Sequence, residues 1–97
     1  MGQVSVVDVP ERSRYEVEQD GEVIGFAAYS RQGDSVVLPH VEVEPAHQHQ
    51  GLAGRLVQQA MDDARAQGLR VLPICPFAVR WIGEHPEYQD LDARRAS

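Results

Sequence analysis

The segment His40-Val-Glu-Val-Glu-Pro-Ala-His-Gln-His-Gln-Gly-Leu-Ala-Gly-Arg-Leu-Val-Gln-Gln-Ala-Met61 decides the fold, because it joins a strand pattern to a helix pattern. Up to Val43, apolar and polar residues alternate, which is typical of a strand with one buried face. Pro45 has no amide hydrogen and therefore ends the strand pairing. From Leu52 onward the spacing predicts an amphipathic helix whose buried face carries Leu52, Leu56, Val57, Ala60, Met61 and Ala64.

The turn between this strand and this helix reads Gln48-His-Gln-Gly-Leu-Ala53. Gly51 and Gly54 allow the backbone to turn and to approach a ligand closely. Such a turn points amide hydrogens outward at the positive end of the helix dipole, which suits a pyrophosphate. The sequence has neither the three glycines of a Rossmann fingerprint nor the Gly-Lys-Ser/Thr of a P-loop. We therefore predict an anion site built from main-chain groups.

The composition indicates one soluble domain over residues 1–97, with 42% hydrophobic and 25% charged residues. A net charge of −6 argues against nucleic acid or an anionic membrane as the main partner. All nine basic residues are arginine, so only guanidinium groups and backbone amides can hold an anionic cofactor. The single cysteine excludes an internal disulfide, and the sequence has no signal-peptide pattern and no apolar run long enough for a membrane span. We expect a cytoplasmic protein.

The rest of the chain predicts an α+β fold with a mostly antiparallel sheet of about five strands, flanked by one long and one short helix. The expected strands cover residues 3–9, 14–19, 22–31, 35–44 and 69–75. The expected helices cover residues 50–67 and 77–84, with Cys75 as N-cap of the second helix and residues 92–97 as a frayed tail. Asp20-Gly21 predicts a two-residue hairpin turn, and Gly25 is expected to permit close packing.

The fourth expected strand carries the residues of greatest chemical interest. A strict alternation places Val36, Leu38, His40 and Glu42 on one face, which begins apolar and ends polar. Pro39 implies a bulge or a free edge in the middle of this strand. Main-chain groups that lose a strand neighbour there are available to an extended ligand.

Three pieces of the sequence together resemble the GNAT superfamily of N-acetyltransferases, in particular its minimal branch of about a hundred residues. They are the strand at residues 38–43, the turn at residues 48–53, and the run Pro73-Ile-Cys-Pro-Phe77 that leads to His85-Pro-Glu-Tyr88. The resemblance spans residues 13–91. It implies acetyl-CoA binding in a cleft where two strands splay apart, with a catalytic pair at His40 and Cys75.

The resemblance also implies how the cofactor is held. The pantetheine arm would pair with the backbone around Val41 and Val43, and the pyrophosphate would lie on the amides of residues 48–54. Arg55 and Arg80 lie near helix starts, where they are candidates for phosphate contacts. The expected cofactor-binding residues are Val41, Val43, Gln48, His49, Gln50, Gly51, Leu52, Ala53, Gly54, Arg55 and Arg80.

The roles of the catalytic candidates remain open at this stage. Cys75 at a helix N-terminus is placed to form a thiolate that accepts the acetyl group, but a lone cysteine is also a common core residue. A neutral imidazole at His40 can take a proton near neutral pH, while the alternative is a structural histidine beneath the second helix. Glu42 is the competing general base. Direct transfer and transfer through Cys75 are therefore both possible.

Two other functions are weighed against an enzyme that acetylates a small-molecule or protein amine. The N-terminal helices with which larger GNAT enzymes recognise their acceptor have no counterpart, which leaves a non-catalytic CoA-binding or acyl-CoA-binding module as the alternative. A metal site formed by His40, His47 and His49 is not favoured, because no cysteine or carboxylate completes it. We expect a monomer or a weak homodimer, since the first strand has a free edge.

Overall fold

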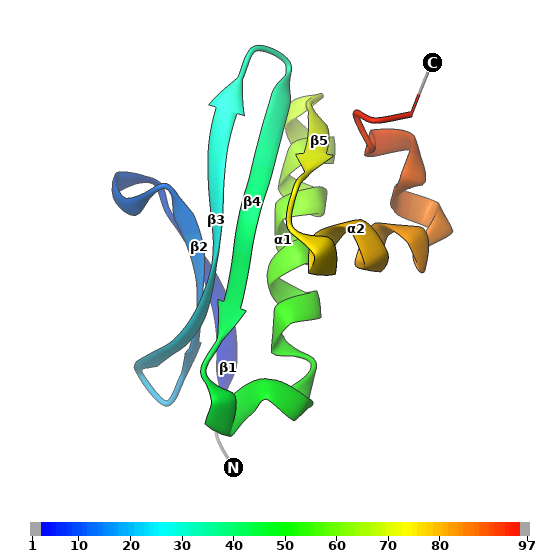
Figure 1. Cartoon of the computed structure of the whole chain (residues 1–97). Helices are drawn as coiled ribbons and strands as arrows, with labels where there is room; N and C mark the ends of the chain where they lie inside the picture. The colour runs from blue at the N-terminus through cyan, green and yellow to red at the C-terminus, as the bar shows by residue number, and fades with distance from the viewer. Residues whose placement is uncertain (1–2, 96–97) are drawn as a thin grey trace.

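The computed structural model describes residues 3–95 as one sheet with two α-helices and three short 3-10 helices (Figure 1). The elements in chain order are β1 (Val4–Val9), η1 (Pro10–Arg12), β2 (Arg14–Gln19), β3 (Glu22–Gln32), β4 (Ser35–Val43), η2 (Pro45–Gln50), α1 (Leu52–Gln67), β5 (Arg70–Pro73), α2 (Pro76–Gly83) and η3 (Pro86–Leu91). The predicted α+β class is confirmed. The expected strands and helices are all present, and their ends differ from the prediction by at most two residues.

The strands lie in the order β1-β2-β3-β4-β5. Each of the first three strands pairs antiparallel with the next, whereas β4 and β5 are parallel because α1 crosses between them. Asp20 and Gly21 have φ values of 53° and 82°, as the predicted hairpin turn requires. The β4–β5 pairing joins only residues 35–38 to residues 70–73. In Figure 1, β5 accordingly lies beside the first half of β4 alone.

A bulge at Pro39 changes which side chains of β4 are buried. Leu38 and Pro39 together lie opposite the single residue Tyr29 of β3, so the register shifts by one residue. The expectation that Leu38, His40 and Glu42 share a face is therefore wrong. Leu38 is fully buried, whereas His40 and Glu42 are exposed on the opposite face. We call this second face, which points away from α1, the outer face of the sheet.

The helix α1 covers the inner face of the sheet. Its predicted apolar stripe is confirmed, since each member is at most 3% exposed: Leu52, Leu56, Val57, Ala60, Met61 and Ala64. These side chains pack on inner-face residues that include Val17 and Ile24. Burial of one such aliphatic side chain contributes roughly 1.5–3 kcal/mol, so this stripe is a main source of stability.

Gly25 lies where β2, β3 and β4 approach most closely. A Cβ atom at this position would lie 2.8 Å from the Glu42 carbonyl oxygen and 3.0 Å from methyl carbons of Val17 and Val43. The predicted close packing at Gly25 is therefore confirmed.

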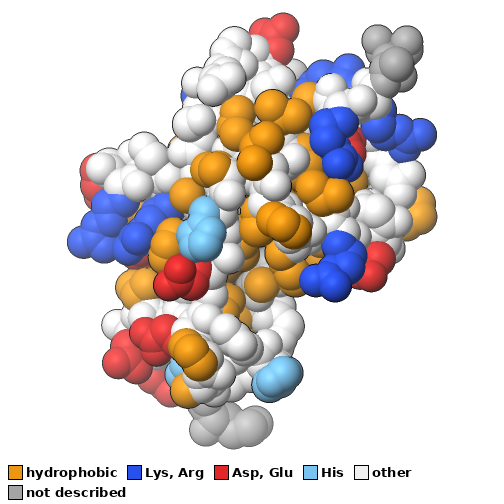
Figure 2. All heavy atoms as spheres, in the orientation of Figure 1, with side chains coloured by type: hydrophobic (Ala, Val, Ile, Leu, Met, Phe, Trp, Pro, Cys, Tyr) orange, Lys and Arg blue, Asp and Glu red, His pale blue; other side chains and the backbone are white. Residues whose placement is uncertain are grey.

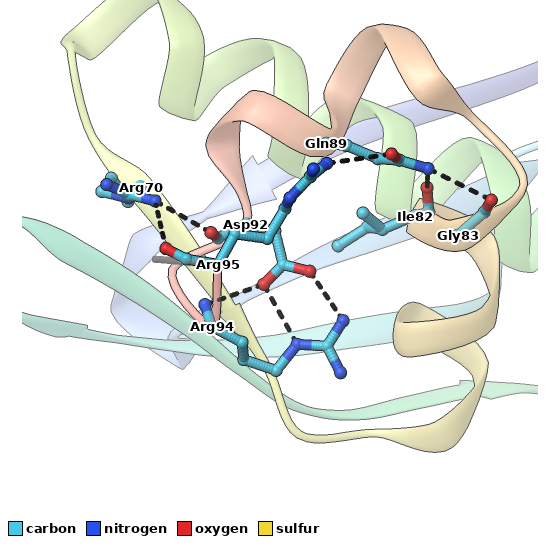
Figure 3. A network of polar contacts seen from close by, with 7 residues as sticks. All are labelled: Arg70, Ile82, Gly83, Gln89, Asp92, Arg94 and Arg95. Carbon is cyan, nitrogen blue, oxygen red and sulfur yellow. Dashed lines mark hydrogen bonds and ion pairs between the residues drawn. The ribbon is translucent and has the colours of Figure 1, made fainter. Parts of the chain in front are cut away.

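Residues 92–95 are docked on the sheet and are not the expected frayed tail; residues 96 and 97 lie outside the described part. The amide of Ala93 donates to the Val71 carbonyl at 2.7 Å, which places this segment along the free edge of β5. The buried Asp92 carboxylate accepts hydrogen bonds from the side chain and the amide of Arg94, the shortest at 2.6 Å (Figure 3). The Arg70 guanidinium donates to the Asp92 carbonyl at 3.0 Å.

Candidate active site

The strands β4 and β5 part at a defined point, and we call the opening beyond it the fork. The Leu38 carbonyl accepts hydrogen bonds from the amides of both Ile74 and Cys75, at 3.0 and 3.1 Å. After this shared acceptor the two chains diverge. β4 continues to Val43, whereas the chain after Pro73 turns into α2. The fork is thus produced by a strand that ends early beside one that continues.

The side of β4 that faces the fork carries main-chain groups without a strand neighbour. The Glu44 amide donates to the Ile24 carbonyl of β3 at 2.8 Å. Because main-chain groups alternate along a strand, those of Val41 and Val43 point away from β3. The Val43 carbonyl accepts a hydrogen bond from the Gln48 side chain at 3.2 Å, which agrees with this direction. The edge at Val41 and Val43 therefore has the geometry needed to pair with an extended ligand.

His40 and Glu42 are brought together on the outer face. Nε2 of His40 lies 3.0 Å from Oε1 of Glu42, and the two side chains are 56% and 62% exposed. If Nε2 donates to Glu42, the Nδ1 lone pair is free to accept a proton. His40 does not lie beneath the second helix, because the bulge turns it to this open face. In Figure 2, a histidine lies between acidic and basic side chains on the part of the surface over β3 and β4.

Cys75 lies on the opposite side of the fork. It is the N-cap of α2, as predicted, but its side chain makes no capping hydrogen bond. The residue is 8% exposed and belongs to the hydrophobic core cluster. Within residues 3–95 the thiol has no hydrogen bond to His40 or Glu42. The proposed pair of His40 and Cys75 is thus split between an exposed and a buried position.

The turn before α1 differs in detail from the prediction. Residues 45–50 form the 3-10 helix η2, Gly51 adopts a left-handed conformation with φ of 73°, and α1 begins at Leu52 and not at Gln50. No side chain caps α1, and its first turn contains no acidic residue. The amides of Leu52, Ala53 and Gly54 precede the first intrahelical hydrogen bond, so they are available to an anion.

Gly54 also has a packing role that the sequence does not reveal. A Cβ atom there would lie 3.2 Å from Nε1 of Trp81 on α2. Trp81 is 8% exposed and belongs to the hydrophobic core. Its indole stacks on the His85 ring with a centroid distance of 3.8 Å. The absence of a side chain at Gly54 thus lets α2 pack close to the start of α1.

The two arginines proposed for phosphate contacts are in different situations. Nη2 of Arg55 lies 3.5 Å from the Val4 carbonyl, so its guanidinium extends toward β1, at the other edge of the sheet from the fork. Arg80 is exposed on α2, and its guanidinium has no hydrogen-bond partner within residues 3–95. Of the two, Arg80 is the one that the structure leaves free to bind a ligand.

The outer face holds a second polar cluster that the sequence analysis missed. The Glu16 carboxylate is only 5% exposed and accepts hydrogen bonds from Arg14 at 2.8 Å and from Arg12 at 3.1 Å. The hydrogen bond from Arg14 is the main reason that the pKa of Glu16 lies below its ordinary value of 4.5. Arg14 also lies 4.5 Å from the centre of the Phe26 ring. The only sequence signal is the i, i+2 spacing of Arg14 and Glu16 on one strand face.

Neither a metal site nor a membrane span is found in the described chain. Among residues 3–95, histidine, cysteine and acidic side chains nowhere gather in a group of three that could hold a metal ion. No helix in this part of the molecule combines the length and the apolar character needed to cross a bilayer.

The family of the chain is shown by a match to the family model described as GCN5-related N-acetyl-transferase. The match covers residues 14–91, which is most of the chain and includes the fork, the turn and Cys75. The chain therefore belongs to this family of acyltransferases, and the resemblance inferred from the sequence is confirmed.

Solved structures of other proteins share this fold. A GCN5-like protein from Staphylococcus aureus has 17% identity and a TM-score of 0.74, over 95% of this chain and 90% of that one. The ribosomal-protein-S18-alanine N-acetyltransferase of Escherichia coli has 16% identity and a TM-score of 0.67, over 87% and 76%. At these identities the likeness shows the fold alone.

A third similar structure contains the cofactor. The GNAT family acetyltransferase of Brucella melitensis in complex with acetyl-CoA has 27% identity and a TM-score of 0.57, over 70% of this chain. The aligned part is only 50% of the Brucella chain, so the two proteins correspond over their shared fold and not over their whole length.

Proposed function

We propose that this chain transfers the acetyl group of acetyl-CoA to the nitrogen of an amine. The observation that carries the proposal is the fork itself. Beyond the point where β4 and β5 separate, β4 carries an open strand edge and an imidazole–carboxylate pair, and α1 begins with free amides after the turn that follows β4. These are the three kinds of group that binding an acyl thioester and deprotonating an amine require.

The residues around the fork fit the cofactor that the Brucella neighbour contains. The amides of Leu52, Ala53 and Gly54 would receive the pyrophosphate, since no side chain competes for them. The open backbone edge at Val41 and Val43 would pair with the amide groups of the pantetheine arm. The Gln48 side chain, which caps the Val43 carbonyl, would have to move aside for the arm to pair there.

His40 and Glu42 would supply the proton transfer. Bound acetyl-CoA provides a thioester carbonyl carbon, which forms the new C–N bond with the amine as the C–S bond breaks. The sulfur leaves as the thiol because it takes the second proton that the attacking nitrogen loses when the amide forms. Nδ1 of His40 would take the proton that the ammonium must lose before its nitrogen can attack. The carboxylate of Glu42, 3.0 Å from Nε2, would orient the ring and stabilise the imidazolium that results.

The positions of the side chains favour direct transfer over a route through Cys75. A thiol that accepts the acetyl group needs a base within reach, and Cys75 is buried without a hydrogen bond to His40 or Glu42 among the described residues. We therefore expect Cys75→Ala to retain acetyl transfer. An acetylated Cys75 that forms and decays at the rate of turnover would overturn this preference.

The first test measures cofactor binding by calorimetric titration with acetyl-CoA and with CoA. Gly51→Val should weaken binding at least about tenfold, because a β-branched residue at φ of 73° forces the turn to change shape. Gly51→Asn is the matched control, since asparagine tolerates this conformation and should keep most of the affinity. If the wild-type protein binds neither ligand, the proposed function falls.

The second test measures acetyl transfer to a panel of amines. His40→Ala should lower kcat by about 10²–10⁴, as loss of a general base does, and should flatten the pH profile of kcat. Glu22→Gln removes an exposed carboxylate elsewhere on the sheet and should leave kcat unchanged. Tight CoA binding without transfer to any amine would instead support the non-catalytic binding module.

A further inference from the structure

A hollow in the outer face adjoins the His40–Glu42 pair. It has a volume of about 160 Å³ and lies over β3 and the end of β4. Its apolar lining comes from Val23, Ile24 and Phe26, and the backbone of Gly25 also lines it. Glu42 and Glu44 also line the hollow. Glu42 therefore belongs both to the proposed catalytic pair and to this hollow.

The hollow carries an excess of negative charge. Its lining residues carry two carboxylates, those of Glu42 and Glu44, against one guanidinium, that of Arg14, which together with Arg12 also binds the buried Glu16. The Glu42 carboxylate lies 3.0 Å from the His40 ring. Glu44 is exposed, and within the described residues its carboxylate forms no hydrogen bond or ion pair. A ligand that places a positive charge beside Glu44 would therefore meet an unbalanced carboxylate.

The spacing of the two carboxylates selects the length of the ligand. Glu44 directly follows β4 in an extended conformation, two residues after Glu42, and an extended backbone separates the Cα atoms of such residues by roughly 7 Å. An extended chain advances about 1.2 Å per single bond, so about five or six bonds match this separation. Two nitrogens joined by four or five methylene groups are separated by this number of bonds. The apolar lining of Val23 and Phe26 lies where such methylene groups would pass.

We propose that the acceptor of this chain is a short aliphatic α,ω-diamine with a spacer of four or five carbons. One amine lies at His40 and Glu42 and receives the acetyl group, while the other stays protonated and binds Glu44. The ring face of Phe26, already flanked by Arg14 and His40, contacts the methylene groups. This assignment rests on the proposed acetyl transfer, because it names the substrate of that site.

Steady-state kinetics with acetyl-CoA tests the assignment by comparing 1,4-diaminobutane with 1-aminobutane. The two differ by one ammonium group, and a charge-assisted hydrogen bond to Glu44 should raise kcat/KM for the diamine by about tenfold or more. Glu44→Gln should reduce the ratio of the two kcat/KM values to near one. Glu22→Gln, on the same sheet but outside the hollow, should preserve the ratio.

A binding experiment separates this inference from the proposed function. NMR titration of the protein with 1,4-diaminobutane, without acetyl-CoA, should shift the amide signals of Gly25, Phe26 and Glu44 to saturation, whereas 1-aminobutane should leave them in place. Such shifts without any acetyl transfer would overturn the function and keep the binding site. Equal transfer to both amines, a preference for lysine peptides, or transfer without these shifts would overturn the diamine assignment and keep the function. Neither transfer nor shifts would overturn both.

Discussion

At the scale of single residues, Gly25 is where the sheet tolerates least change. We expect Gly25→Ala to destabilise the fold by about 1–3 kcal/mol, because the new methyl group would lie 2.8 Å from a backbone oxygen that cannot move alone. The same displacement would shift Glu42, whose carbonyl is the contacted group, and should lower acetyl transfer as well. Urea unfolding and an activity assay on the same sample measure both effects.

Gly83→Ala provides the matched control. Gly83 ends α2, and a Cβ atom there would meet no heavy atom within 4 Å. Alanine is the better helix former, so this variant should be neutral or slightly more stable. Equal free energies of unfolding for Gly25→Ala and Gly83→Ala would contradict the close packing of β2, β3 and β4 at Gly25.

Residue-level prediction from the sequence succeeded where a local rule determines the outcome and failed where a neighbouring strand does. The stripe of α1 follows from a 3.6-residue period, and the left-handed turn at Asp20 follows from the Asp-Gly pair. The face of His40 could not be obtained in this way, since a strict alternation counts across the bulge at Pro39. The burial of Glu16 depends on Arg12, which lies in η1 before β2 and covers the carboxylate. No residue pattern within β2 predicts this contact.

At the scale of elements, the docked C-terminal segment makes a specific prediction at Asp92. We expect Asp92→Asn to cost about 1–3 kcal/mol at pH 7, because it removes the charge from a buried carboxylate that accepts hydrogen bonds from Arg94. Asp90→Asn is the control. Asp90 pairs with Arg65 at 3.1 Å, but this side chain is 63% exposed, so the melting temperature should stay close to that of the wild type.

The pH dependence of the Asp92 effect follows from the direction of its pKa shift. The hydrogen bonds from Arg94 hold the pKa of Asp92 below its ordinary value of 3.8. The folded-state pKa is the lower one, so the carboxylate stabilises the fold above pH 3.8 and this contribution is lost as the pH falls through the folded pKa. The difference between wild type and Asp92→Asn should therefore shrink in acid. A difference that is constant from pH 7 to pH 3 would contradict the ion pair.

The docking of residues 92–95 was not predicted, because it depends on contacts with residues that are distant in the sequence. Residues 92–95 are an aspartate, an alanine and two arginines, a composition that resembles a solvated tail. They are held instead by β5, a strand of four residues whose far edge is otherwise free. A short edge strand gives no local signal of what covers it, so the docking of Ala93 on Val71 was visible only in three dimensions.

At the scale of the whole molecule, the proposed cofactor should stabilise the native state. A ligand present at a hundred times its Kd contributes about 2.7 kcal/mol. In a domain of this size each kcal/mol raises the melting temperature by about 4–8 °C, so acetyl-CoA should raise it by roughly 10–20 °C. Gly51→Val should show little of this increase. An unchanged melting temperature of the wild-type protein at saturating acetyl-CoA would contradict a site in the fork.

The short pairing of β4 with β5 has a kinetic consequence. The strands from β1 to β4 form consecutive hairpins whose contacts are near in sequence, and such contacts form early. β5 can join only after the whole of α1 has crossed the sheet, so the fork lies at the boundary between the part that folds first and the part that docks last. We expect native-state hydrogen exchange to show β5 and α2 opening together while β2 and β3 remain protected. A ligand that contacts both β4 and the β5–α2 part would slow this opening. Its residence time on the protein would then set how often β5 and α2 detach from the sheet.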